Sequence, residues 1–221
     1  MARLHGNGFQ NGFTGKFGNL VGCKWKGIFY IRTRPLTVNH PNTEKQLAQR
    51  MRFSTVQQFL SPIKDFLRLG FGAFSINRSG HNAAMSYNMR NALTGVYPDI
   101  AVDPTQFLFS RGSLPGAENA HTQINAEGLL EITWSTPYME DLMRNNDRVI
   151  ILLKTMNHES GTYHLDVASR RDGRAAVTIG PPFTTNETAC YLIFATASML
   201  LGDFAKDHIS DSVYAGMVGG V

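Results

Sequence analysis

The chain has 221 residues, of which 43% are hydrophobic and 17% are charged, and its formal net charge is +4. This composition can bury a core and excludes a disordered polar chain, while the length allows one large domain or two of about 100 residues. No run of 18 uncharged apolar residues is present, so no membrane-spanning helix is expected. The first residues lack the apolar region of a secretory signal, which predicts synthesis in the cytoplasm, with later release in a particle left open.

The charges are divided unevenly along the chain. Residues 1–106 contain 13 Lys or Arg and 4 Asp or Glu, whereas residues 107–221 contain 8 and 13. One interpretation is a basic half that contacts nucleic acid. The other is self-association, in which a basic surface of one copy meets an acidic surface of the next.

Residues 6–22 are rich in glycine, and Phe9, Phe13 and Phe17 are spaced four apart within them. This much glycine excludes a stable isolated helix. We interpret the fourfold spacing as unsuited to an ordinary strand and expect an extended, turn-rich arm. Such an arm would be ordered only when its aromatic side chains pack against a partner.

Residues 20–35 predict a β-hairpin, because Trp25, Phe29 and Tyr30 favour strands and Gly27 suits a turn. Basic residues are interleaved with the aromatic ones in this region and continue at residues 50 and 52. They suit phosphate contacts next to stacked bases, or they form the solvated face of a hairpin. The candidate contacts for nucleic acid or an acidic partner are Lys16, Lys24, Lys26, Arg32, Arg34, Arg50 and Arg52.

Helical periodicity follows over residues 43–69, with a capping box at Thr43 and Gln46. Ser61 and Pro62 predict a break, because they suit the N-cap and first position of a second helix. Residues 80–94 predict a third, more polar helix that ends at Gly95.

From residue 106 onward, short strand-like segments alternate with turn clusters about every ten residues. Trp134 is expected in the core of this region. The fold class is therefore α+β: a glycine-rich arm, β-hairpin and helices in residues 1–105, followed by a fibronectin- or immunoglobulin-like antiparallel β-sandwich in residues 106–221. The expected strands are 106–110, 120–125, 129–134, 148–154, 162–169, 175–179, 189–197 and 213–218.

No motif for catalysis, metal binding or cofactor binding stands out. Lys16 follows a glycine-rich stretch, but Phe17 occupies the place where a phosphate-binding loop needs Ser or Thr. No His or Cys pair has metal-ligand spacing, and no nucleophile motif is present. Cys23 and Cys190 are expected to be free thiols. We therefore expect no catalytic residue, no metal and no cofactor.

Four segments together resemble an uncharacterised family of bacterial proteins, a domain of unknown function. They are GFTGKFGNLVGCKWKGIFYIRTRP, NTEKQLAQRMRFSTVQQFLSPI, NAAMSYNMRNALTGVYPD and SDSVYAG, and they extend over nearly the whole chain. The family has no established activity, so the resemblance implies no functional residue. The pattern of Thr43, Gln46, Arg50 and Phe53 also resembles short helical segments of phage-encoded structural proteins.

The leading hypothesis is a non-enzymatic structural protein that assembles with itself into a particle, ring or filament, such as a phage-derived virion or tail-like component. The alternatives are a nucleic-acid-binding module using the basic half, and an adhesion or ligand-binding protein using the sandwich loops. The candidate assembly contacts are Phe9, Phe13, Phe17 and Trp25.

Overall fold

The computed structural model describes residues 3–4, 12–35, 43–125, 127–135, 144–157 and 160–220. It has an α+β fold with antiparallel sheets, and it divides into two compact units, Met1–Thr43 and Glu44–Val221. This division differs from the expected boundary after residue 105, because the helices share a buried core with the C-terminal strands. No helix in the described part of the chain is long and apolar enough to cross a membrane.

The C-terminal unit contains two antiparallel sheets and a short strand pair. The four-stranded sheet has the order β10 (Gly161–His164), β9 (Arg148–Thr155), β12 (Thr188–Ala195) and β13 (Val213–Val218). The three-stranded sheet has the order β11 (Arg174–Thr178), β8 (Leu129–Ser135) and β7 (Glu118–Ile124). The strand pair joins β5 (Leu93–Thr94) and β6 (Ala101–Val102).

Among the described residues of this unit, three α-helices precede the two sheets along the chain and a fourth follows β12. The α-helices are α1 (Glu44–Leu60), α2 (Phe66–Gly70), α3 (Gly80–Asn91) and α4 (Ala197–Leu200). The 3-10 helices are η2 (Ser61–Ile63), η3 (Gly72–Phe74), η4 (Arg144–Asn146), η5 (Arg170–Asp172) and η6 (Lys206–His208). The break predicted at Ser61 and Pro62 is confirmed, because α1 ends at Leu60 and η2 begins at Ser61, but Ser61 is the first residue of η2 and not its N-cap.

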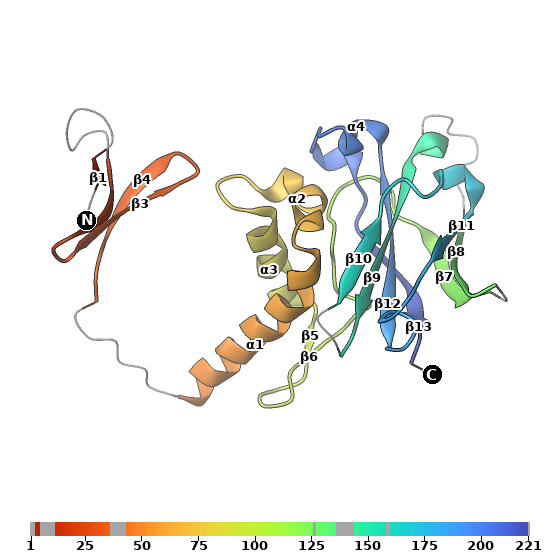
Figure 1. Ribbon diagram of the computed structural model, residues 1–221, viewed down its shortest axis with the longest axis horizontal. Coiled ribbons are helices and arrows are strands. Elements are labelled where there is room, and N and C mark those ends of the chain that lie inside the picture. The colour runs from red at the N-terminus through yellow and green to blue at the C-terminus, as the bar shows by residue number, and fades with distance from the viewer. Residues whose placement is uncertain are drawn as a thin grey trace. The chain divides into compact units, whose positions relative to one another are not determined.

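Strands β9 and β12 are buried on both faces, and side-chain alternation divides them between two cores. Ile150 and Leu152 belong to the cluster formed with α1, α2 and α3. Val149, Ile151 and Leu153 belong to the cluster formed with β8 and β11. Figure 1 shows α1, α2 and α3 on one side of this strand pair and β7, β8 and β11 on the other. The central pair therefore holds three layers together.

The N-terminal unit is an antiparallel sheet with the order β1 (Arg3–Leu4), β2 (Phe13–Phe17), β3 (Leu20–Trp25) and β4 (Ile28–Thr33). The predicted hairpin is confirmed as β3 and β4. The expectation that the preceding segment forms no strand is wrong, because β2 pairs with β3. A spacing of four is an even number, so Phe13 and Phe17 are compatible with the twofold alternation of a strand.

Most strands predicted in the C-terminal unit are confirmed to within two residues, and β13 has the predicted bounds. The predicted strand 162–169 is only partly confirmed, because β10 ends at His164. Residues 106–110 form no strand. Phe107 and Phe109 are nevertheless buried, and their rings contact each other and the ring of Phe59 on α1. Their apolar pattern reflects burial against a helix rather than a place in a sheet.

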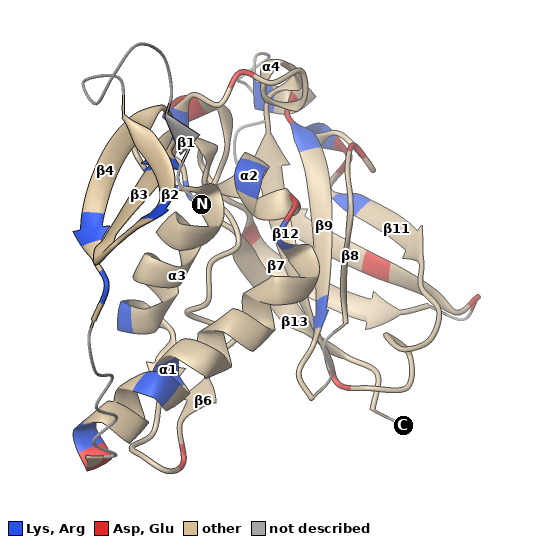
Figure 2. Ribbon diagram, turned by 60° about the vertical axis from the view of Figure 1, so that its left-hand side comes forward, with Lys and Arg blue, Asp and Glu red and all other residues tan. Residues whose placement is uncertain are grey.

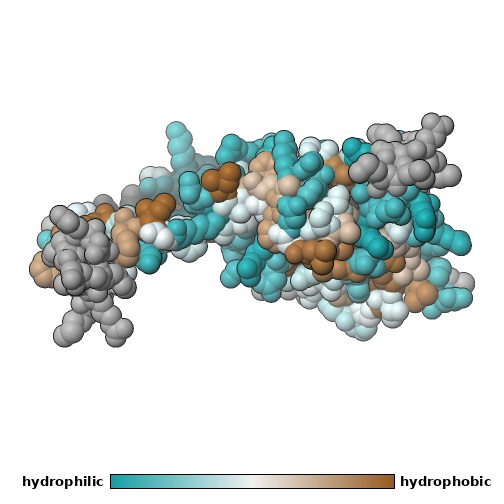
Figure 3. Space-filling view, turned by 90° about the horizontal axis from the view of Figure 1, so that it is seen from above, coloured by the Kyte–Doolittle hydropathy of each residue, from teal (hydrophilic) through white to brown (hydrophobic). Residues whose placement is uncertain are grey.

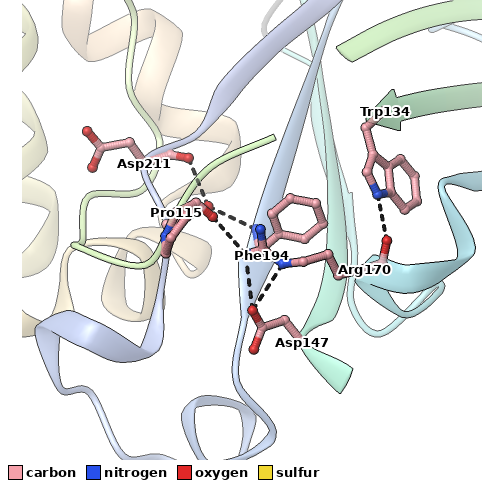
Figure 4. Close-up of polar contacts among 7 residues, drawn as sticks. Pro115, Trp134, Asp147, Arg170, Phe194 and Asp211 are labelled. Atoms are coloured by element: carbon pink, nitrogen blue, oxygen red, sulfur yellow. Dashed lines mark hydrogen bonds and ion pairs between the residues drawn. The ribbon is translucent and has the colours of Figure 1, made fainter. Parts of the chain in front are cut away.

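A buried ion pair fastens η5 to the start of β9. The guanidinium of Arg170 donates to the Asp147 carboxylate at 3.0 and 3.1 Å and to the Pro115 carbonyl at 2.7 Å (Figure 4). It also lies 3.8 Å from the ring centroid of Phe194. The Trp134 indole N–H donates to the Arg170 carbonyl at 2.8 Å. Because both charged side chains are at most 5% exposed, each depends on the other for compensation.

Asp147→Ala should lower the free energy of unfolding by about 3–5 kcal/mol, because it leaves the Arg170 charge buried beside an apolar ring. Arg171→Ala is the matched control, since the neighbouring Arg171 is 63% exposed and lies 3.8 Å from Asp172. The control should cost less than about 1 kcal/mol. Urea unfolding of the full chain measures both. Similar losses for the two variants would contradict a structural role for the buried pair.

Candidate interaction surface

The turn between β3 and β4 determines how the N-terminal sheet presents its outer strand. Lys26 and Gly27 have φ values of 48° and 85°, as a two-residue type I′ turn requires. The Arg34 N–H then donates to the Asn19 carbonyl at 2.7 Å, so even-numbered residues of β4 are hydrogen-bonded to β3. The backbone groups of Ile31 therefore point toward the outer edge, where no described strand pairs with β4.

The register of the sheet sorts its side chains onto two faces, because cross-strand partners share a face and neighbours along a strand alternate. Phe17 pairs with Leu20 and Gly22 pairs with Ile31, which defines an apolar face of Phe17, Leu20 and Ile31. Lys24 also lies on the apolar face, whereas the other face carries two cations together with two exposed rings. We define this basic–aromatic face as Lys16, Trp25, Tyr30 and Arg32.

The predicted assembly contacts are distributed over both faces and the interior of this sheet. Phe13 is buried against Gly22, where an added Cβ would lie 2.6 Å from the ring of Phe13. Phe17 is exposed on the apolar face, and Trp25 is 50% exposed on the basic–aromatic face. Phe9 lies outside the described residues. Hydrophobic atoms of this sheet reach the surface at the left of Figure 3.

The predicted basic contacts of the hairpin region are all exposed, but they do not share one face. Lys16 and Arg32 lie on the basic–aromatic face. Lys24 lies on the opposite face, where its Nζ is 4.8 Å from the ring centroid of Phe29. Lys26 occupies the turn and Arg34 follows β4. Figure 2 marks the Lys and Arg positions in blue.

The remaining two basic candidates belong to the C-terminal unit. Arg50 is exposed on α1 beside a hollow that Gln46, Gln49 and Phe53 also line. Arg52 is half-buried, and its guanidinium donates to the Met89 carbonyl on α3 at 3.1 Å. Arg52 therefore connects two helices within the C-terminal unit.

No carboxylate is present in the sequence of the N-terminal unit. Residues 1–43 contain six Lys or Arg and no Asp or Glu, whereas residues 44–221 contain 15 and 17. A side-chain hydrogen bond with Cys23 across the β3–β4 pair raises the pKa of Tyr30. The phenol therefore stays neutral at physiological pH, and the unit has no carboxylate that would repel an approaching anion.

The C-terminal unit contains a cavity of about 430 Å³ at the junction of α1, β6 and the end of β9. Lys154 lines it together with Thr55, Gln58 and Asn157. The Lys154 side chain is 2% exposed, donates to the Thr155 carbonyl and lies 4.7 Å from the Phe59 ring centroid. Lys154 was not among the candidates predicted from the sequence, although a charged residue directly after the apolar run 149–153 was a usable signal.

Burial shifts the pKa values of several groups of this unit, among them Cys190 and His81. Desolvation raises the pKa of the Cys190 thiol to about 12, so it stays protonated and unreactive at neutral pH. Desolvation is also the main cause that lowers the pKa of His81 below 6.5, and the nearby Lys64 charge adds to it. The buried His81 Nε2 has no hydrogen-bond partner among the described residues.

Comparison with known proteins gives a family for the chain. The model of a family of unknown function, DUF6266, matches residues 12–216, and the chain belongs to this family. The match begins at the residue before β2 and therefore includes the sheet strands β2 to β4 and the C-terminal unit as far as residue 216. No curated protein and no solved structure is significantly similar to the chain.

The pKa of His81 makes a pH dependence testable. Because its folded-state pKa lies below 6.5, the unfolded chain binds a proton more readily, and stability is lost as the pH falls below about 6.5. His81→Gln should reduce the difference in unfolding free energy between pH 7 and pH 5, measured by urea titration. His121→Gln, at an exposed position on β7, is the control and should leave that difference in place. Equal effects of the two variants would contradict the assignment.

Proposed function

We propose that the chain is a non-enzymatic structural protein that assembles with itself into a particle, ring or filament through its N-terminal sheet. The observation that carries this proposal is the outer strand β4. Its first four residues, Ile28 to Ile31, are apolar or aromatic and contain no proline, and Ile31 is 56% exposed. Proteins usually protect such an edge with charge, proline or a covering element, because it pairs readily with another chain.

The small core of the N-terminal unit supports the same conclusion. Among its described residues only Phe13 and Gly22 are buried, while Leu20 and Ile31 remain at the surface. Complete burial of an isoleucine or leucine side chain stabilises a protein by about 1.5–3 kcal/mol. A sheet of this size therefore gains a large share of its stability when a second copy covers its apolar face.

The charge distribution favours a second copy as the partner. The N-terminal unit is uniformly basic, whereas residues 107–221 contain 13 Asp or Glu and 8 Lys or Arg. The basic part of one copy attracts the acidic part of another copy, whereas two basic parts or two acidic parts repel each other. A phage-derived virion or tail-like particle is the natural setting for such an assembly, and repeated contacts between unlike surfaces close into rings or extend into filaments.

In this proposal the C-terminal unit faces outward from the assembled particle, ring or filament. The packing of Leu130 and Ile132 of β8 against Ile151 and Leu192 of the larger sheet supports a fibronectin-like sandwich, with helices covering the outer face of the larger sheet. The N-terminal sheet makes the contacts between copies.

Ile31→Pro tests the edge strand directly. Proline removes the outward N–H of residue 31 without removing a hydrogen bond between β3 and β4, so it should block pairing at the edge. Light scattering coupled to size exclusion should find oligomers for the unmodified chain. The variant should form smaller species, and it should need an at least tenfold higher protein concentration to form the same oligomers.

Ile31→Val is the matched control, because it keeps the N–H and a strand-favouring side chain, and it should assemble like the unmodified chain. Ile31→Lys covers the case in which proline unfolds the hairpin, because a charge at the edge opposes pairing without affecting the backbone. A monomeric unmodified chain at high concentration would contradict the proposed assembly. Unchanged oligomers in both Ile31→Pro and Ile31→Lys would contradict the role of β4.

A further inference from the structure

We infer that the basic–aromatic face of the N-terminal sheet, formed by Lys16, Trp25, Tyr30 and Arg32, binds single-stranded nucleic acid. This function goes beyond self-assembly and does not depend on it, because it uses the face of the sheet opposite the apolar face. The register of the strands, the exposure of the two rings and the charge of the unit support it independently.

The register places cations and rings side by side. Lys16 pairs with Val21, and Val21 pairs with Arg32, so the two cations flank β3 in one row, about 10 Å apart. Tyr30 pairs with Cys23 in the next row on the same face, and Trp25 follows two residues farther along β3. Tyr30 therefore lies about 7 Å along the strand from the row of cations. Each nucleotide carries a phosphate and a base, so a single strand on this face can place a phosphate near the row of cations and a base against a ring.

The two rings are accessible for stacking. Trp25 is 50% exposed and Tyr30 is 48% exposed, although aromatic side chains are usually more deeply buried in a folded domain. Proteins that bind single strands combine such exposed rings with a positively charged groove or surface, because every base has a face that can stack. The described sheet has both elements on one face.

The charge of the unit favours a polyanion. Residues 1–43 contain no Asp or Glu, so phosphates near Lys16 and Arg32 meet no side-chain repulsion from this unit. A lipid headgroup or a sulfated polysaccharide would satisfy the cations but has no planar base for Trp25 and Tyr30. Bases inside a duplex are stacked on each other and cannot reach these rings, which selects a single strand.

Lys24 provides an internal control for this assignment. It lies in β3 next to Trp25 but on the opposite face, with its Nζ 4.8 Å from the ring centroid of Phe29. Lys24 and Lys16 are both exposed and carry the same charge. If net charge alone attracted the nucleic acid, Lys16 and Lys24 would contribute equally. Binding on the basic–aromatic face depends instead on Lys16 and Arg32.

The test is a titration of the full chain with an oligothymidylate of about 15 nucleotides, within the usual site sizes of single-strand binders. Fluorescence anisotropy reports binding, and tryptophan fluorescence reports stacking. The chain has two tryptophans, and Trp134 is buried, so quenching on binding reports Trp25. Affinity should fall as salt rises, and Lys16→Ala and Arg32→Ala should each reduce the slope of log K against log salt by about 0.7.

Trp25→Ala should weaken binding by about 5- to 150-fold, and Lys24→Ala should leave both affinity and slope close to those of the unmodified chain. Trp25→Phe keeps a ring and should retain most of the affinity, which separates loss of stacking from loss of folding. Three results would overturn the inference: no binding at low salt, binding without tryptophan quenching, or equal weakening by Lys24→Ala and Lys16→Ala. Binding of heparin or anionic vesicles without binding of the oligonucleotide would also overturn it.

Discussion

The fold of the C-terminal unit depends on one pair of strands, β9 and β12, which is apolar on both faces. Their residues alternate between two cores, so that Ile150 and Tyr191 pack toward the helices while Ile151 and Leu192 pack toward β8 and β11. Removal of either layer would expose one whole face of the pair to water. The helices and the second sheet therefore stabilise the same two strands, and the buried pair of Arg170 and Asp147 fastens a loop beside them.

The N-terminal sheet follows the same alternation without a described layer on either side. Its apolar face and its basic–aromatic face both reach the surface, and its outer strand has no described neighbour. The two proposals follow from this difference. A face with Leu20 and Ile31 gains stability from apolar contact, whereas a face with Lys16 and Trp25 gains it from phosphates and bases. The family match includes the residues of β2 to β4 but not those of β1.

Local patterns were sufficient to predict several elements of the fold but not its layers. The break at Pro62 and the strand 213–218 depend on neighbouring residues, and both are confirmed. The burial of both faces of residues 149–153 removes the twofold pattern that would have assigned each side chain to a core. The partners Asp147 and Arg170 are 23 residues apart, so only the folded chain brings them together. For the candidate surface, the sequence located the basic and aromatic residues, but only the register separates Lys24 from Lys16.

Hydrogen–deuterium exchange at several protein concentrations tests assembly through β4 most directly, because it observes individual amides of the strand. If β4 mediates assembly, the amides of Ile31 and Thr33, which point to the outer edge, should become protected as concentration rises. The amides of Tyr30 and Arg32, which are bonded to β3, should change much less. Rapid exchange of Ile31 and Thr33 at every concentration, including those at which the chain is oligomeric, would contradict assembly through β4.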